Sequence, residues 1–186
     1  MFLLVGLGNP GKQYQTHRHN VGFMVLDALS SQLKLNFAKS NFGAELANTV
    51  IAEQKVLLAK PQEYMNCSGR AVRSLSDYYQ VPHEHIVVVH DEVDLPFGAI
   101  RWQQARGHGG HNGVRSIIAE LGDNTFCRLR VGVGRPPHSQ QDVADFVLAA
   151  FSAEERKTLQ DQVLKAAQSL QDFVREGLNA VQQRYH

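Results

Sequence analysis

The chain of 186 residues has little cysteine, no long apolar run and no excess of charge of either sign. Its two cysteines, Cys67 and Cys127, are too few for a disulfide scaffold. The longest apolar run, 146–151, is far shorter than the roughly 18 residues that a membrane-spanning helix needs. The 19 lysines and arginines nearly balance the 18 acidic residues, which excludes a uniformly basic nucleic-acid coat protein. Since no secretory signal precedes Phe2–Val5, we expect a reduced, cytoplasmic protein without a membrane segment.

The composition is typical of a globular protein, with 43% hydrophobic and 20% charged residues. No repeat or linker divides the chain, so we expect one domain over residues 1–186. Strand-like runs lie at 2–6, 55–59, 86–90, 100–103 and 128–133, with weaker candidates at 45–51 and 146–148. Helical periodicity lies at 21–33, 69–80, 113–121 and 159–178, the last behind a capping box of Ser152 and Glu155. This alternation predicts an α/β/α sandwich with a mixed, mostly parallel, twisted sheet flanked by helices.

Charge is distributed unevenly along the chain. Residues 101–135 contain six arginines against Glu120 and Asp123, whereas residues 142–176 contain seven acidic residues against four basic ones. Positive charge in the middle of the chain suits a phosphate-bearing partner. Ordinary solvated surface charge explains the same counts equally well.

The segment Gly6–Gly11 follows the first predicted strand and matches the G-x-G-x-x-G dinucleotide fingerprint in form. That fingerprint needs a helix that opens within the glycines and an acidic residue about 20 positions later. Here Pro10 and Gly11 favour a turn, and 30–37 contains no acidic residue. Dinucleotide binding is therefore a minor alternative to a tight loop that exposes the amide of Asn9.

Two further segments offer acid–base chemistry. His17–Gly22 opens the first long helix with two histidines, and a histidine there suits a general base because its ordinary pKa lies near neutrality. The strand at 86–90 ends in several acidic residues, of which Asp91 comes first. Asp91 is the best candidate to orient a histidine, although a loop-capping role explains its position as well.

Two polar segments contain asparagines next to helices. The glycine-rich loop 106–113 carries two histidines and Asn112, and its backbone amides are able to bind anions. Asn66 precedes the helix at 69–80, where N-capping is its ordinary role. The loop composition indicates the edge of a site.

Other hydrolytic chemistries find little support. No G-x-S-x-G elbow occurs, and Cys67 beside an apolar run is more typical of core packing than of a nucleophile. Neither H-E-x-x-H nor paired C-x-x-C spacing is present. A zinc site remains conceivable from His17, His19, His90, His108 and His111 with Asp91.

In their order along the chain, these segments resemble the bacterial-type peptidyl-tRNA hydrolase family. Six blocks carry the resemblance across nearly the whole chain. They are Gly6–Gly11 with Tyr14, Arg18–Gly22, Tyr64–Gly69, His90–Pro96, Gly109–Gly113 and Arg128–Gly134.

The resemblance implies hydrolysis of the ester that joins a peptide to the terminal ribose of tRNA. His19 then falls on the family's catalytic histidine, which activates water, and Asp91 on the carboxylate that orients it. No covalent enzyme intermediate is needed. The resemblance assigns the binding of peptide, ester and water to Asn9, Asn66 and Asn112, and the channel lining to Tyr14, Tyr64 and His111.

By the same resemblance, Arg130 grips a phosphate at the acceptor end of tRNA. Where many members place its basic partner, this chain has Gln103, so Arg101 or Arg106 is expected to compensate. His17 replaces a usual threonine.

The expected partner is peptidyl-tRNA, through its acceptor stem, 3′ end and peptide, with no metal or cofactor and a monomeric state. Two rivals remain. A non-catalytic RNA-binding module would use the same basic region, and a zinc-dependent hydrolase would use the histidines.

Overall fold

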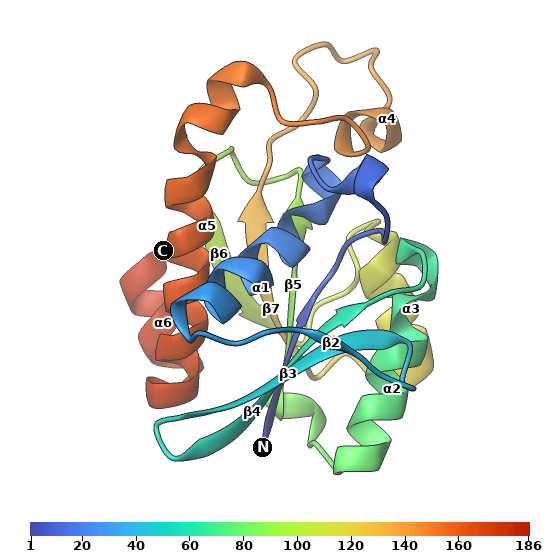
Figure 1. The fold of residues 1–186 in the computed structure, drawn as a ribbon. Helices are drawn as coiled ribbons and strands as arrows, with labels where there is room; N and C mark the ends of the chain where they lie inside the picture. Colours follow the sequence, from blue (N-terminus) through green and yellow to red (C-terminus); the bar gives the residue numbers. More distant parts are fainter.

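The computed structural model describes all 186 residues and contains one seven-stranded sheet between two layers of helices (Figure 1). The strands are β1 (Phe2–Gly6), β2 (Ala38–Lys39), β3 (Ala44–Ile51), β4 (Gln54–Pro61), β5 (Ile86–Glu92), β6 (Ile100–Gln104) and β7 (Cys127–Gly132). Their order is β2-β3-β4-β1-β5-β7-β6. The four central strands are parallel, and the antiparallel pairs lie toward the two edges. The predicted mixed sheet is therefore confirmed.

Helices cover both faces of this sheet. They are α1 (Val21–Gln32), α2 (Ser68–Tyr79), α3 (Asn112–Leu121), α4 (Val143–Val147), α5 (Ala153–Glu176) and α6 (Leu178–Tyr185). Four short 3₁₀ helices are η1 (Lys12–Tyr14), η2 (Arg18–Asn20), η3 (Met65–Cys67) and η4 (His83–His85). In Figure 1, α1, α5 and α6 lie on one side of the sheet, and α2 and α3 lie on the other. None of the helices combines the length and apolar character that crossing a bilayer requires.

The central strands bury both of their faces, which is why they are continuous apolar runs. In β1, Leu4 packs into the core under α1 and α5, while Leu3 and Val5 pack into the core under α2 and α3. All three side chains are fully buried. The two cores hold the sheet between its helical layers.

One weak strand prediction is wrong. Residues 146–148 belong to α4 and its C-terminal end, not to a strand. The side chain of Asp142 accepts a hydrogen bond from the backbone of Ala144, which starts a helix immediately before the apolar run. Phe146 and Val147 of this run are both buried.

The C-terminal helical region is divided into α5 and α6. Gly177 separates them with a positive φ of 90°, a conformation that favours glycine. The predicted capping box is confirmed, because Glu155 N donates to Ser152 Oγ and Ser152 N donates to Glu155 Oε1. The two-residue strand β2 has no counterpart among the predictions.

Close packing at Gly22 places the start of α1 at the carboxyl ends of β1 and β5. A Cβ atom on Gly22 would lie 2.4 Å from the carbonyl oxygen of Val89 and 2.6 Å from the backbone nitrogen of Leu7. Only glycine permits this approach without a backbone shift. The helix start, and with it η2, therefore sits directly on the ends of the central strands.

We expect Gly22→Ala to lower the free energy of unfolding by about 1–3 kcal/mol, because the methyl group overpacks against the backbone of β5 and of Leu7, the residue after β1. Urea unfolding followed by circular dichroism measures the change. Gly107→Ala is the control, since nothing lies within 4 Å of its added Cβ, and its stability should stay within about 0.5 kcal/mol of wild type. Equal stability of the two variants would contradict the packing argument.

Candidate active site

Four segments converge at the carboxyl ends of the central strands. β1 leads into the loop that carries Asn9, and β5 carries Asp91 near its end. His19 lies in η2, which contacts β5, and His111 is the N-cap residue of α3. Ends of parallel strands are common positions for sites in α/β proteins, because loops from several strands meet there.

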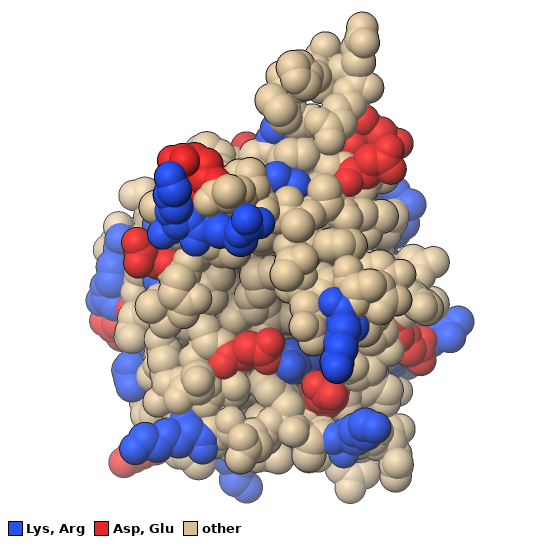
Figure 2. Space-filling model, turned by 45° about the horizontal axis from the view of Figure 1, so that its top comes forward, with Lys and Arg blue, Asp and Glu red and all other residues tan.

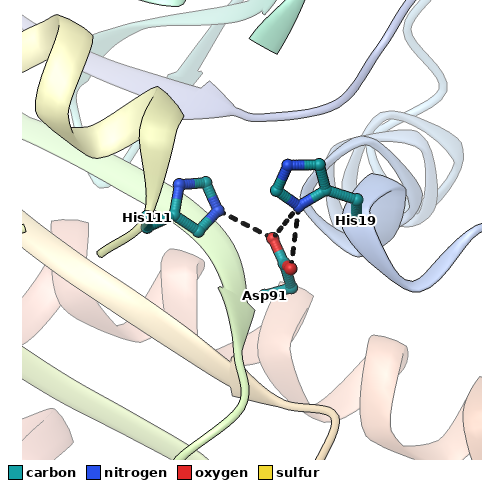
Figure 3. A group of neighbouring side chains, drawn as sticks. All are labelled: His19, Asp91 and His111. Carbon is teal, nitrogen blue, oxygen red and sulfur yellow. Dashed lines mark hydrogen bonds and ion pairs between the residues drawn. The ribbon is translucent and has the colours of Figure 1, made fainter. Parts of the chain in front are cut away.

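Asp91 accepts hydrogen bonds from two imidazole rings, one on each side (Figure 3). His19 Nδ1 lies 3.0 Å and 2.9 Å from the two carboxylate oxygens, and His111 Nε2 lies 2.8 Å from Oδ1. Asp91 is only 3% exposed. A carboxylate removed from water in this way needs such donors to remain charged.

The hydrogen bonds fix the tautomers of both rings. His111 Nδ1 accepts from the backbone N–H groups of Gly113 and Val114, at 3.1 and 3.3 Å, and so caps α3. The proton of neutral His111 is therefore on Nε2 and is donated to Asp91. His19 donates from Nδ1 to the same carboxylate, which leaves a lone pair on Nε2. His19 can thus act as a base, whereas both nitrogens of His111 are engaged.

The electrostatics of the site agree with this arrangement. Burial opposes ionisation of Asp91, but the electrostatic attraction of its carboxylate to His19 and His111, and the N–H groups that both rings donate, outweigh burial and hold the Asp91 pKa well below its ordinary value. Burial also opposes a charged His19, yet attraction and hydrogen bonding to Asp91 outweigh burial and raise the His19 pKa. The carboxylate is therefore ready to stabilise an imidazolium on His19.

A third imidazole, His90, is buried next to the site and is neutral. Arg128 Nε donates to His90 Nε2 at 3.1 Å, so His90 carries its proton on Nδ1 and donates it to the carbonyl oxygen of Asp91 at 2.8 Å. Burial, with the electrostatic influence of nearby His111 and Arg128, lowers the His90 pKa well below its ordinary value. Arg128 Nη1 also donates to the carbonyl oxygen of Gly107 at 2.6 Å, which ties the glycine-rich loop to β7.

The amide of Asn9 is held in one orientation. Asn20 donates from Nδ2 to the Asn9 carbonyl and accepts from the Asn9 backbone N–H, both at 2.9 Å. The side-chain oxygen of Asn9 accepts from the backbone N–H of Met65 at 2.8 Å. Because that oxygen is engaged, Asn9 has its amino group left to donate to a ligand.

A cavity of about 520 Å³ opens beside His19 and Asp91. Of the substrate-binding residues predicted from the sequence, five line it: Asn9, Tyr64, Asn66, His111 and Asn112. Helix α4 contributes an apolar part of the wall, with Val143, Ala144, Val147 and the adjoining Leu148. The cavity thus combines polar groups at one part of its wall with an apolar surface at another.

Tyr14 and Asn66 differ from expectation in local detail. Tyr14 is not part of the cavity wall and packs edge-on against Tyr64, with ring centroids 6.3 Å apart. Asn66 does not cap α2, because the N-cap residue is Cys67 and no side chain caps that helix. The amide of Asn66 lines the cavity instead.

The predicted phosphate-binding residues lie on β7, β6 and the loop that follows. Arg130 and Arg101 are directly paired across the antiparallel strands β7 and β6, and Gln103 is paired with Arg128. Arg130 lies 3.6 Å from Glu92, and its buried Nε has no hydrogen-bond partner. Arg106 lies beyond β6, with an exposed side chain.

The zinc hypothesis is reduced to three residues. His19, Asp91 and His111 place their ligand atoms within 4.8 Å of one another. His90 is engaged by Arg128, and His108 Nδ1 accepts from Gly110 N at 2.9 Å. A metal bound by the three would displace the hydrogen bonds between them. This follows because His111 uses one ring nitrogen for the α3 cap and the other for Asp91.

Neither cysteine lines the cavity. Burial raises the pKa of Cys127 to about 11, as expected of a core thiol.

Sequence reasoning assigned no role to Asn20 or Arg128, and it considered His90 only as a conceivable zinc ligand. Asn20 is part of the block Arg18–Gly22, and His90 directly precedes Asp91, so position next to a site residue was the available signal. The contact of His90 with Arg128 joins residues 38 positions apart, which no local pattern reveals.

The sheet carries helices on both faces and presents a histidine–aspartate pair to a cavity at its strand ends. This arrangement is typical of a hydrolase site.

The family model described as peptidyl-tRNA hydrolase matches residues 3–186. Peptidyl-tRNA hydrolase from Kineococcus radiotolerans is 47% identical over 100% of this chain and 96% of its own length, and that from Nocardia farcinica is 48% identical over 99% and 95%. A solved structure of the Acinetobacter baumannii peptidyl-tRNA hydrolase is 33% identical, with a TM-score of 0.88 over 98% of this chain and 94% of that one.

The chain therefore belongs to the peptidyl-tRNA hydrolase family and is an enzyme of that class. The resemblance inferred from the six sequence blocks is confirmed.

We expect NMR titration of the imidazole signals to give a His19 pKa above the ordinary histidine value, and a lower one in Asp91→Asn. The reason is that the raised pKa depends on the charge of Asp91, and the variant removes that charge. Asp77→Asn, which removes an exposed carboxylate paired with Arg73, is the control and should leave the His19 titration unchanged. A His19 pKa that is the same in wild type and Asp91→Asn would contradict the assigned pair.

Proposed function

We propose that this enzyme hydrolyses the ester between a peptide and the terminal ribose of tRNA, with His19 as general base. The observation that supports this most is the unengaged Nε2 of His19 beside a cavity, in a ring whose Nδ1 is bonded to buried Asp91. A base with a fixed tautomer and a carboxylate behind it is suited to deprotonate water.

In this mechanism water attacks the ester carbonyl carbon while His19 Nε2 takes one of its protons. Asp91 stabilises the resulting imidazolium. The tetrahedral intermediate collapses when the bond to the ribose oxygen breaks, and the imidazolium returns its proton to that oxygen. The products are a peptide carboxylic acid and tRNA with a free terminal hydroxyl, and no covalent enzyme intermediate forms.

Three asparagine amides support the reaction. Asn9 is a hydrogen-bond donor toward the substrate, since its oxygen is bound by Met65 N. Asn66 and Asn112 line the same cavity and hold the peptide backbone, the ester region or the attacking water. Neutral donors near a developing oxyanion stabilise it without an unpaired buried charge, and one such donor contributes roughly 3 kcal/mol in comparable sites.

The aromatic residues and His111 shape the site. Tyr64, 58% exposed, forms part of the substrate channel, and Tyr14 packs edge-on against its ring. His111 acts through Asp91, to which it donates a hydrogen bond. We assign it the positioning of the carboxylate in addition to lining the channel.

The tRNA acceptor end binds at Arg130, and we propose that Arg101 is its basic partner in place of Gln103. Arg101 and Arg130 are direct cross-strand neighbours, so their side chains lie on the same face of the sheet. The single carboxylate near Arg130 is Glu92 at 3.6 Å, so a phosphate that binds both arginines would relieve their mutual repulsion. Arg106 lies outside this cross-strand pair.

Charge on the surface agrees better with local phosphate binding than with a general RNA-binding strip. On the face drawn in Figure 2, lysines and arginines form separate groups with acidic side chains among them. A non-catalytic RNA-binding module, the first rival, would rely on a more continuous basic surface. The enzyme acts as a monomer on the acceptor stem, 3′ end and peptide of its substrate.

We expect Arg101→Ala to weaken tRNA binding and to reduce the slope of log affinity against log salt by about one, because one phosphate contact is lost. Affinity measured at several salt concentrations tests this. Arg106→Ala is the matched control and should leave the slope unchanged. A reduced slope in Arg106→Ala and an unchanged slope in Arg101→Ala would instead identify Arg106 as the phosphate-binding partner of Arg130.

We expect wild-type enzyme to release the acyl group from N-acetyl-aminoacyl-tRNA but not from the matching free-amine aminoacyl-tRNA. His19→Ala should lower the rate on the order of 10²–10⁴-fold and retain tRNA binding. His83→Ala, which removes an imidazole paired with Asp123 outside the cavity, is the control and should be fully active.

A chelator should have no effect on that rate, because the proposed base is His19 rather than a metal-bound water. Loss of activity on chelation, restored by zinc, would support the zinc hydrolase. Tight binding of tRNA without cleavage of either substrate would support the RNA-binding module.

A further inference from the structure

Arg18 directly precedes the proposed base, and the mechanism gives it no role. The residue is only 7% exposed, which is unusual for arginine and requires compensating partners. These partners lie more than 120 residues away along the chain, in and around α4. Arg18 therefore connects the segment that carries His19 to a distant part of the cavity wall.

The guanidinium group of Arg18 makes three kinds of contact. Nη1 donates to the carbonyl oxygen of Phe146 at 3.1 Å, at the end of α4. Nη2 forms an ion pair with Glu155 at 2.7 Å. The group also lies over the ring of Phe146 in α4, with its central carbon atom 3.9 Å from the ring centroid. Only a planar fork of donors makes these contacts together.

The backbone reinforces the same connection. Arg18 N donates to the carbonyl oxygen of Ala149 at 3.1 Å, and Phe151 N donates to that of Thr16 at 3.3 Å. His17 and Ala150 form an antiparallel bridge between these two bonds. The residues before His19 thus pair with the residues that link α4 to α5.

Glu155 has two tasks, because the oxygen that binds Arg18 also completes the capping box of α5. Glu155 Oε1 accepts from Ser152 N at 2.8 Å as well as from Arg18. One guanidinium therefore ties together η2, the C-terminal end of α4 and the first turn of α5. Among the helices and strands, η2 is the element that α4 contacts most.

The opposite side of α4 faces the cavity. Val143, Ala144, Val147 and Leu148 form an apolar part of its wall, and Leu148 is 42% exposed there. Such a surface suits apolar side chains of a peptide and not a phosphate or a ribose. The position of α4 relative to His19 thus determines whether a peptide side chain meets this wall while its ester carbonyl meets the base.

We propose that Arg18 is a positioning residue that holds the apolar wall of α4 in register with His19, and so sets affinity for the peptide part of the substrate. The inference rests on the proposed function. Arg18 acts through α4, because its guanidinium contacts Phe146 and Glu155 and makes no contact with Asp91. Its effect belongs to substrate binding and not to the proton transfer.

The test compares Arg18→Lys with wild type on two substrates that carry the same tRNA, N-acetyl-phenylalanyl-tRNA and N-acetyl-glycyl-tRNA. Lysine keeps the charge and can still pair with Glu155, but it lacks the planar fork of donors that binds Glu155 and the Phe146 carbonyl together. KM for the phenylalanyl substrate should rise roughly tenfold, within the up to about 100-fold that a misplaced positioning group costs. KM for the glycyl substrate, which has no side chain to meet the wall, and kcat for both should stay unchanged.

Arg73→Lys is the matched control. Arg73 also pairs with a carboxylate, Asp77, and donates to a carbonyl oxygen, that of Glu120, but it lies on the surface outside the cavity wall. Both substrates should be cleaved normally.

Glu155→Gln retains the capping box while it removes the charge that binds Arg18, so it should raise KM in the same substrate-selective way by a smaller factor. This variant tests the proposal should Arg18→Lys fail to fold.

Leu148→Ala tests whether Arg18 affects KM through the apolar wall of α4. If Arg18 acts through the wall, the combined variant Arg18→Lys with Leu148→Ala should raise KM for the phenylalanyl substrate by less than the product of the two single effects. Multiplicative effects, an equal loss on both substrates, or a fall in kcat with a shifted pH profile would each overturn the proposal. Failure of wild type to cleave either substrate would instead overturn the proposed function.

Discussion

Asp91 is a charged group without access to water, and the arrangement around it follows from the need to compensate that charge. An isolated buried carboxylate is strongly unfavourable, so it persists only where donors surround it. Here His19 comes from η2 and His111 from the start of α3, while β5 fixes the carboxylate between them. The pair His19–Asp91 is assembled only when the sheet and both flanking segments are folded. Stability of this region and competence of the base are therefore linked.

The parts of the fold that the sequence predicts best are those whose pattern has one physical reading. β1 and β5 are continuous apolar runs between turn signals, and both are buried central strands. The strand prediction for 146–148 was wrong because a short apolar segment is equally compatible with a strand or with one side of a helix. Only the cap at Asp142 separates the two possibilities. β2 was missed because two residues carry no period.

The site was predictable as a set of positions but not as a set of hydrogen bonds. The resemblance pointed to Asn9, and the structure places it on the cavity wall. That its side-chain amide has only its amino group left for a ligand depends on Met65, 56 positions away, while Asn20, 11 positions away, holds the backbone of Asn9. Such contacts depend on tertiary packing, which spacing does not encode. His111 as the cap of α3 was also hidden, because helix N-caps are usually serine, threonine, aspartate or asparagine.

The identity of that cap has a chemical consequence at His19. The N–H groups in the first turn of α3 have no partner within the helix, and His111 Nδ1 accepts hydrogen bonds from two of them, those of Gly113 and Val114. A neutral imidazole that accepts at Nδ1 must donate at Nε2, so His111 is a donor to Asp91 and leaves the carboxylate its full negative charge. That charge in turn holds the proton of His19 on Nδ1 and leaves the lone pair on Nε2 facing the cavity. A serine cap would satisfy the helix equally well, but it would leave Asp91 with one donor fewer and a higher pKa. The ability of His19 to act as a base thus begins with the capping requirement of a helix on the opposite side of the site.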